Sequence, residues 1–139
     1  MISTLSCSTR SLSRSAISAI SRSNKRQPLH SSRVTMAVTS LEDDESVPPF
    51  LEKNKKAILY FTAGWCPPCK MIKPIYSGLS DEYDHCGFGM IDVDEVFETS
   101  GKAGVTSIPA FHFMEDGKKV SEVIGADQDA LRKAIENWK

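Results

Sequence analysis

Two cysteines separated by two prolines are the residues of this chain best suited to chemistry. Cys66 and Cys69 lie in a Trp-Cys-Pro-Pro-Cys motif that follows the apolar run 57–61 and a short turn of small residues. The apolar run is typical of a buried strand, and a helical pattern begins inside the motif. We therefore expect both thiols at the start of a helix, where they can form and exchange a disulfide.

The position of each thiol predicts its role. Unpaired amides and the positive end of the helix dipole favour the thiolate of Cys66, which makes it the nucleophile. Cys69 lies one turn further along and is expected to be more buried, so it remains a thiol until it attacks Cys66. Pro67 and Pro68 fix two backbone dihedrals and remove two amide donors, and we expect this to tune the reduction potential.

A zinc site is the alternative chemistry for a Cys-x-x-Cys pair, with His85 and Cys86 as the second half. Structural zinc sites favour Gly and polar residues between the thiols, and two adjacent ligands make a poor bite for one tetrahedral ion. We expect no metal and no bound cofactor. Cys86 itself is expected to be a small apolar or semi-exposed residue near a strand start, with a regulatory or dimer-forming thiol as the alternative.

Alternating strands and helices must position this site. The pattern predicts strands at 33–38, 57–61, 87–93, 110–114 and 119–124, and helices at 47–53, 66–83, 95–103 and 127–139. Pro74 should kink the second helix, and the turn at 115–118 should close a hairpin. This order predicts an α/β fold with helices on both faces of a mixed sheet, which has parallel pairs and a terminal antiparallel hairpin.

Length and charge divide the chain into a tail and one domain. Residues 1–41 carry six basic and no acidic residues, a charge of +6, whereas residues 42–139 carry 11 basic and 18 acidic residues, a charge of −7. An acidic domain argues against a nucleic-acid partner. No apolar run approaches the roughly 18 residues that span a bilayer, so we expect no membrane association. Four cysteines are too few for a disulfide-stapled scaffold.

The tail has the composition of an organelle transit peptide. Twelve of the first 40 residues are Ser, and Leu12, Ala16 and Ile20 would form one apolar edge of a helix. We expect a transit peptide at 1–33 and a folded domain at 34–139. A disordered Ser/Arg-rich tail is the alternative.

Several further motifs, in order and at family spacing, resemble thioredoxin over about residues 34–139. They are Trp65 to Lys70, Pro74, Asp92 to Glu95, Ile108-Pro109 and Val123 to Ala126. The resemblance implies the thioredoxin fold, with Pro109 in the cis form facing the dithiol. It also implies a flat apolar client-binding surface around Cys66, formed by Trp65, Pro68, Ile108, Pro109 and Gly125.

The chain departs from the family pattern near the dithiol. Pro67 stands where Gly is usual, and Ala110 stands where Thr is usual. Tyr60 and Met90 replace a buried Asp and its Lys partner, so both halves of a charged pair are absent together. Tyr is a poor base at neutral pH. We therefore expect Cys69 to lose its proton to water or to the departing thiolate, with Tyr60 and Pro67 as tuning residues.

The resemblance also implies a subfamily and a location. The run Tyr-Phe-Thr-Ala at 60–63 is similar to o-type mitochondrial thioredoxins of plants, although tryparedoxins and nucleoredoxin-like proteins share a Tyr-Phe strand end. Together with the tail, this predicts the mitochondrial matrix, with the chloroplast stroma as the alternative.

The predicted function is a monomeric dithiol protein-disulfide reductase with a Cys66–Cys69 redox-active disulfide. By resemblance it would be recharged by a thioredoxin reductase using NADPH, and it would reduce peroxiredoxins and regulatory disulfides. The alternatives are a disulfide oxidase or isomerase, a tryparedoxin-like reductant of peroxiredoxins, and a non-catalytic thioredoxin-fold binding module.

Overall fold

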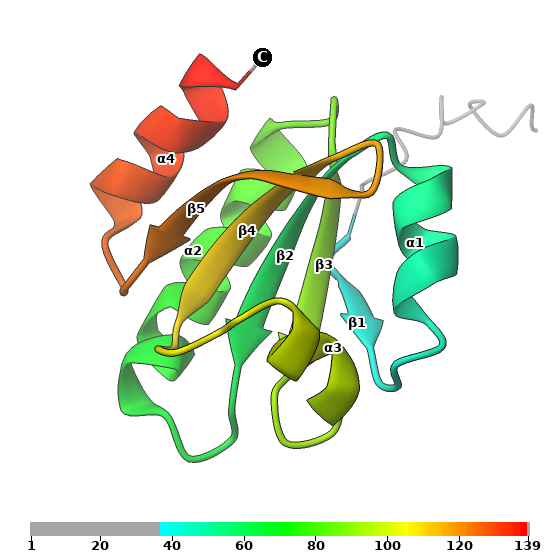
Figure 1. Ribbon diagram of the computed structural model, residues 1–139. Helices are drawn as coiled ribbons and strands as arrows, with labels where there is room; N and C mark the ends of the chain where they lie inside the picture. Colours follow the sequence, from blue (N-terminus) through cyan, green and yellow to red (C-terminus); the bar gives the residue numbers. More distant parts are fainter. Residues whose placement is uncertain (1–36, 139) are drawn as a thin grey trace, which may run out of the picture. The chain divides into compact units, whose positions relative to one another are not determined.

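A five-stranded mixed sheet organises residues 37–138, the part of the chain that the computed structural model describes (Figure 1). The sheet order is β1-β3-β2-β4-β5, in which β1, β3 and β2 are parallel and β4 and β5 are antiparallel to their neighbours. The elements are β1 (Thr39–Leu41), α1 (Val47–Lys53), β2 (Lys56–Thr62), α2 (Pro67–Glu82), β3 (Gly87–Asp92), α3 (Phe97–Lys102), β4 (Ala110–Glu115), β5 (Lys118–Ile124) and α4 (Gln128–Asn137). The predicted order and mixed sheet are confirmed.

Strand β2 lies at the centre of the sheet and contributes side chains to two hydrophobic cores. Its five central residues are buried, and alternate side chains point to opposite faces. Ile58 and Tyr60 belong to the core under α2 and α4. Leu59 and Phe61 belong to the core that contains buried residues of α1. A central strand covered on both faces explains why its sequence is a continuous apolar run.

The first strand lies later in the chain than the sequence predicted. The predicted range 33–38 falls mostly outside the described residues, whereas β1 occupies Thr39–Leu41. Only Leu41 of this strand is buried, so no apolar run marks it. Parallel pairing with β3, which places Thr39 opposite Gly89, makes this segment a strand. The predicted transit peptide at 1–33 also lies outside the described residues.

Helix α2 carries the dithiol, and its own side chains anchor it to the sheet. Pro67 and Pro68 occupy its first turn, where missing amide protons cost nothing and the fixed φ suits a helix. The Tyr76 hydroxyl lies 2.9 Å from the Ile58 carbonyl oxygen and 3.0 Å from that of Gly89. These contacts tie the middle of α2 to β2 and β3.

The hairpin between β4 and β5 turns at Asp116 and Gly117, whose φ values are 48° and 76°. Two consecutive positive φ angles match the two-residue turns that suit the twist of a hairpin, and Asp-Gly is a favoured sequence there. The predicted hairpin is therefore confirmed. Within residues 37–138, every helix is too short or too polar to cross a membrane.

Candidate active site

The two thiols meet at the N-terminus of α2. Cys66 is the N-cap residue, and its Sγ accepts a hydrogen bond from the Cys69 amide at 3.3 Å. The two cysteines form a disulfide with their Cα atoms 5.3 Å apart. Because Pro67 and Pro68 have no amide proton, the Cys69 amide is the first donor the helix can offer, and it points at Cys66. The site therefore provides a donor for a thiolate at Cys66.

Burial alone does not separate the two cysteines. Cys66 is 2% exposed and Cys69 is 1% exposed. The sequence predicted that Cys69 would be the more buried of the two. The two cysteines differ instead in position, because Cys66 is the N-cap of α2 and accepts a hydrogen bond from the Cys69 amide in the first turn.

The loop before β4 lies at the same end of the sheet as the start of α2 (Figure 1). The Ile108–Pro109 peptide bond is cis, and Pro109 is buried. The Gly125 amide donates to the Pro109 carbonyl at 2.8 Å, which places the end of β5 beside this loop. Gly125 has a φ of 101°, a conformation that favours glycine.

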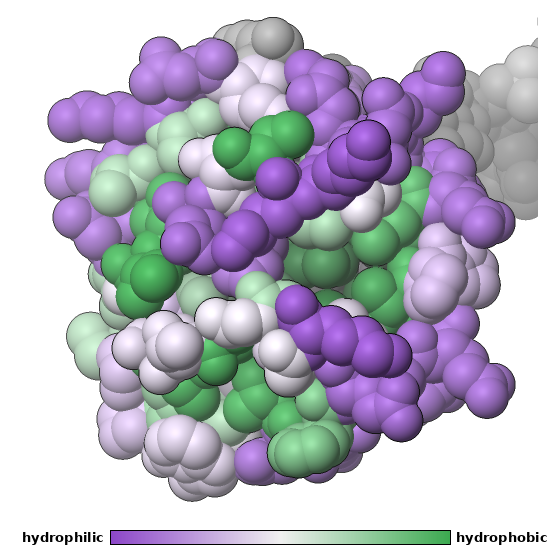
Figure 2. Space-filling view, in the orientation of Figure 1, coloured by the Kyte–Doolittle hydropathy of each residue, from purple (hydrophilic) through white to green (hydrophobic). Residues whose placement is uncertain are grey.

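An apolar groove of about 310 Å³ contains Trp65 and Ile108 together. Trp65 is 68% exposed, Pro68 is exposed, and Ile108 is half-buried. Figure 2 shows apolar and weakly polar side chains gathered in the lower part of the view, with hydrophilic side chains beside them. These residues offer a contact surface beside the dithiol.

Two residues of this region were missed as candidate site residues. The Trp65 Nε1 donates to Asp94 Oδ2 at 2.9 Å, so Asp94 sets the direction of the exposed ring. Phe97 lines the groove with Trp65 and is 77% exposed. The Asp-Val-Asp-Glu motif contained Asp94, although its partner could not be read from spacing. No sequence signal distinguished Phe97 from a buried helix residue.

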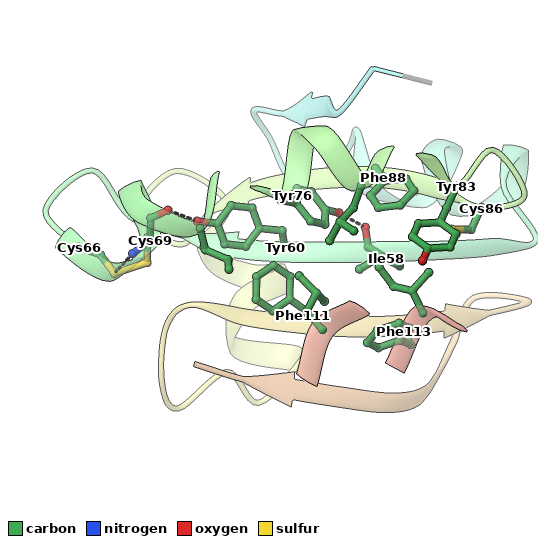
Figure 3. Packing of buried hydrophobic residues seen from close by; sticks show 14 of the residues in the cluster. Ile58, Tyr60, Cys66, Cys69, Tyr76, Tyr83, Cys86, Phe88, Phe111 and Phe113 are labelled. Atoms are coloured by element: carbon green, nitrogen blue, oxygen red, sulfur yellow. Dashed lines mark hydrogen bonds between the residues drawn. A yellow bond between two sulfur atoms is a disulfide. The ribbon is translucent and has the colours of Figure 1, made fainter. Parts of the chain in front are cut away.

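Tyr60 lies behind the dithiol and contacts its backbone. The Tyr60 hydroxyl donates to the Cys69 carbonyl at 2.7 Å (Figure 3). The ring stacks on Phe111, with centroids 4.9 Å apart, and packs against Tyr76 at 5.0 Å. Burial raises the pKa of Tyr60 above its ordinary value. The residue is therefore a neutral hydrogen-bond donor at the first turn of α2.

Comparison with known proteins identifies the family. The sequence profile of the family named Thioredoxin matches residues 38–137. The chain belongs to the thioredoxin family. Thioredoxins are protein-disulfide reductases, and a cysteine pair joined at the start of α2 fits that chemistry.

Individual thioredoxins show the extent of the likeness. The chain is 41% identical over 85 residues to a thioredoxin H-type of Chlamydomonas reinhardtii, a match that covers 60% of this chain and 75% of that protein. It is 40% identical over 82 residues to the TPR repeat-containing thioredoxin TDX of Arabidopsis thaliana, which covers 59% of this chain but only 22% of that longer protein. The oxidised mitochondrial thioredoxin 3 of Saccharomyces cerevisiae has a TM-score of 0.68 at 33% identity, a match that covers 72% of this chain and 94% of that one.

Tyr60 and Met90 give this thioredoxin an uncharged interior behind its dithiol. Tyr60 is buried, and Met90 is half-buried and packs against the same core. The two residues are partners across the β2–β3 pair. A hydroxyl and a thioether therefore stand where the family usually pairs a carboxylate with an ammonium group. Because neither side chain is charged at neutral pH, this interior avoids the desolvation cost of a buried ion pair.

Cys86 lies away from the dithiol, at the start of β3. It is the free cysteine of residues 37–138, and it is 2% exposed. Figure 3 places it at the opposite end of the core from Cys66 and Cys69. Burial raises the pKa of the Cys86 thiol to about 12. Cys86 therefore packs as a small apolar residue, and it does not share a metal site with the dithiol.

Proposed function

We propose that this protein is a dithiol protein-disulfide reductase in which Cys66 is the nucleophile and Cys69 is the resolving thiol. The observation that carries the proposal is the position of the dithiol at the N-terminus of α2. Cys66 is the N-cap of α2, its Sγ accepts a hydrogen bond from the Cys69 amide, and it forms a disulfide with Cys69. A thiolate formed at Cys66 is stabilised by that amide and by the helix dipole.

The proposed reaction has two exchange steps. The Cys66 thiolate attacks one sulfur of a client disulfide, and the other client sulfur leaves as a thiolate. Cys69 then loses its proton and attacks Cys66 Sγ, so that the bond between Cys66 and the client breaks. The client gains two electrons and two protons, and the protein is left with its Cys66–Cys69 disulfide. A dithiol donor must reduce that disulfide before the next turnover.

The client-binding surface would be formed by Trp65, Pro68, Ile108, Pro109 and Gly125, of which Trp65 and Ile108 line the groove beside the dithiol. The cis Ile108–Pro109 bond precedes β4 directly, and Gly125 contacts the Pro109 carbonyl. An extended client segment can pair with the Ile108 backbone by the same hydrogen bonds that add a strand to a sheet. Trp65 and Pro68 would cover apolar side chains next to the client cysteine. Pro67 would tune the potential by stiffening the first turn of α2.

The cellular setting is also a proposal. The Tyr-Phe-Thr-Ala run at 60–63, the basic Ser-rich segment 1–33 and the likeness to a yeast mitochondrial thioredoxin favour an o-type thioredoxin of the mitochondrial matrix. There it would act as a monomer in electron transfer from NADPH through a thioredoxin reductase to peroxiredoxins and other disulfide proteins. Residues 1–33 fused to a cytosolic reporter should direct import into isolated mitochondria. Import into chloroplasts alone would favour the stroma, and no import would refute targeting.

Insulin reduction with dithiothreitol as the donor tests the reductase function. The wild-type protein should accelerate reduction of the insulin disulfides, and Cys66→Ser should abolish that acceleration because no nucleophile remains. Cys86→Ala is the matched control, since it removes a buried thiol at the far end of the core, and it should keep its activity. Acceleration that survived Cys66→Ser would contradict the proposal. A measured reduction potential would separate a reductase from an oxidase or isomerase.

A further inference from the structure

The resolving step requires a route for the proton of Cys69, and the residues behind it do not supply a base. The Tyr60 hydroxyl donates a hydrogen bond to the Cys69 carbonyl, and burial raises the pKa of that hydroxyl. Met90, its partner on β3, has no titratable group. Because Cys69 is only 1% exposed, bulk water does not reach it freely in this state. The proton must therefore leave through some other part of the wall around Cys69.

A cavity of about 210 Å³ lies against Cys69 on the side of β3. Its walls come from the ends of β2 and β3, the first turns of α2 and the last residues of β1. They include Ser40, Leu41, Thr62, Ala63, Gly64, Lys70, Lys73, Met90, Asp92 and Glu95. A water needs roughly 10–15 Å³ and two to four polar partners, so this cavity has room and polar groups for several waters.

Asp92 is the carboxylate of this cavity that the fold holds most firmly. It ends β3 and is paired with Thr62, at the end of the strand that leads to the dithiol. The Asp94 amide donates to Asp92 Oδ1 at 3.0 Å, which orients the carboxylate, and Asp92 is half-buried. Glu95, the other carboxylate of the cavity, is exposed. Lys70 and Lys73 face the same cavity from α2 and carry no acceptor.

We infer that Asp92 is a positioning residue for the resolving step and draws the Cys69 proton through water in this cavity. This inference rests on the proposed reductase function. The Cys69 proton passes to a cavity water, whose opposite side is held by the Asp92 carboxylate, and then to bulk solvent. The Cys69 thiolate attacks Cys66 Sγ, the bond between Cys66 and the client sulfur breaks, and the client sulfur leaves as a thiolate.

Rapid mixing of the reduced protein with 5,5′-dithiobis(2-nitrobenzoate) separates the two steps. The first coloured thiolate is released when Cys66 attacks, at a rate that rises with reagent concentration. The second is released when Cys69 resolves the mixed disulfide, at a rate independent of that concentration. The reagent leaves as a weakly basic aromatic thiolate, so it does not itself accept the Cys69 proton.

Asp92→Asn should slow the second release by about ten-fold or more at pH 7, since positioned groups that assist proton transfer contribute at least that much. The two proteins should converge as the pH rises and hydroxide removes the proton. The first release should stay within about two-fold of wild type. Asparagine keeps an oxygen for the Asp94 amide, so the turn is preserved. Asp81→Asn, which neutralises an exposed acid near the end of α2, is the matched control and should match wild type.

A client with a basic aliphatic leaving thiolate provides a second arm. The defect of Asp92→Asn should be smaller with that client, because the departing thiolate can accept the Cys69 proton. The inference is overturned if Asp92→Asn releases the second thiolate at the wild-type rate and with the wild-type pH profile, or if Glu95→Gln carries the defect instead. A missing first release in the wild-type protein would contradict the reductase function itself, which is a different result.

Discussion

At the scale of single residues, Tyr60 holds the backbone of Cys69 in place and does not act as the base that removes the proton of the Cys69 thiol. Its hydroxyl contacts the Cys69 carbonyl, and its ring fills the core between Phe111 and Tyr76. The sequence predicted that Tyr60 would be a poor base, and the raised pKa agrees with this. The hydrogen bond to Cys69 was not predicted, because it depends on how α2 sits over β2.

Tyr60→Phe should therefore lower stability more than activity. Loss of the hydroxyl leaves the fold about 1 kcal/mol less stable, the usual net value of one hydrogen bond. Turnover with insulin should remain within about three-fold of wild type, since the substitution removes no acceptor for the Cys69 proton. Chemical denaturation and insulin reduction measure the two effects. Tyr76→Phe, which loses its contacts to Ile58 and Gly89, is the control for a buried hydroxyl far from the dithiol. Loss of most turnover in Tyr60→Phe alone would contradict this account.

Asp94 acts at the same scale through the ring of Trp65. Asp94→Ala removes the acceptor for Trp65 Nε1 and should let the exposed ring rotate. We expect KM for a protein client to rise several-fold with little change in kcat, because only client binding is affected. Asp94→Asn keeps an oxygen that can accept from the indole and should stay close to wild type. Equal effects of the two variants would show that the carboxylate charge, and not the hydrogen bond, is what matters.

At the scale of elements, the β4–β5 hairpin pairs a buried histidine with an exposed carboxylate. His112 and Glu122 are cross-strand partners, and His112 Nε2 lies 3.3 Å from Glu122 Oε2. Burial, with a smaller contribution from Lys119, lowers the pKa of His112 despite the attraction of Glu122. The folded protein therefore binds this proton less readily than the unfolded chain does, for which the pKa is about 6.5. The stability that this histidine contributes is fully present above that value and is lost as the pH falls from there through the lower pKa of the folded protein.

His112→Leu should flatten the pH dependence of unfolding between pH 8 and pH 5. One histidine can contribute a slope of at most about 1.4 kcal/mol per pH unit. Urea denaturation at several pH values measures that slope, with His85→Gln as the control because His85 is exposed. We expect the control to retain the wild-type slope. A wild-type protein that lost no more stability than His112→Leu on acidification would contradict the assignment.

The elements also differ in how well their sequences predicted them. Strand β2 and helix α2 were predicted to within a residue or two, because a buried central strand and a proline-started helix have strong local signals. Strand β1 was misplaced, because two of its three residues are exposed and its pairing with β3 is a tertiary effect. The hairpin was predicted because Asp116-Gly117 has the chemistry that its turn demands.

At the scale of the whole molecule, the fold brings together residues that are distant in the chain. Trp65 and Ile108 share one groove, and Gly125 contacts Pro109. These neighbours were expected from the resemblance to thioredoxin and not from periodicity, which places elements along the chain but does not pair their loops. The cavity that joins Cys69 to Asp92 had no counterpart in the sequence reasoning, since it arises from the packing of three strands and a helix.

Trapping of the mixed disulfide tests the central claim, that Cys66 is the nucleophile toward client disulfides. Cys69→Ser removes the resolving thiol, so the first exchange step should stop at a covalent adduct. Intact-protein and peptide mass spectrometry after incubation with a disulfide client should show one adduct, located at Cys66. The double variant Cys66→Ser/Cys69→Ser should form none. An adduct that formed equally well in the double variant, or that mapped to Cys86, would contradict the account.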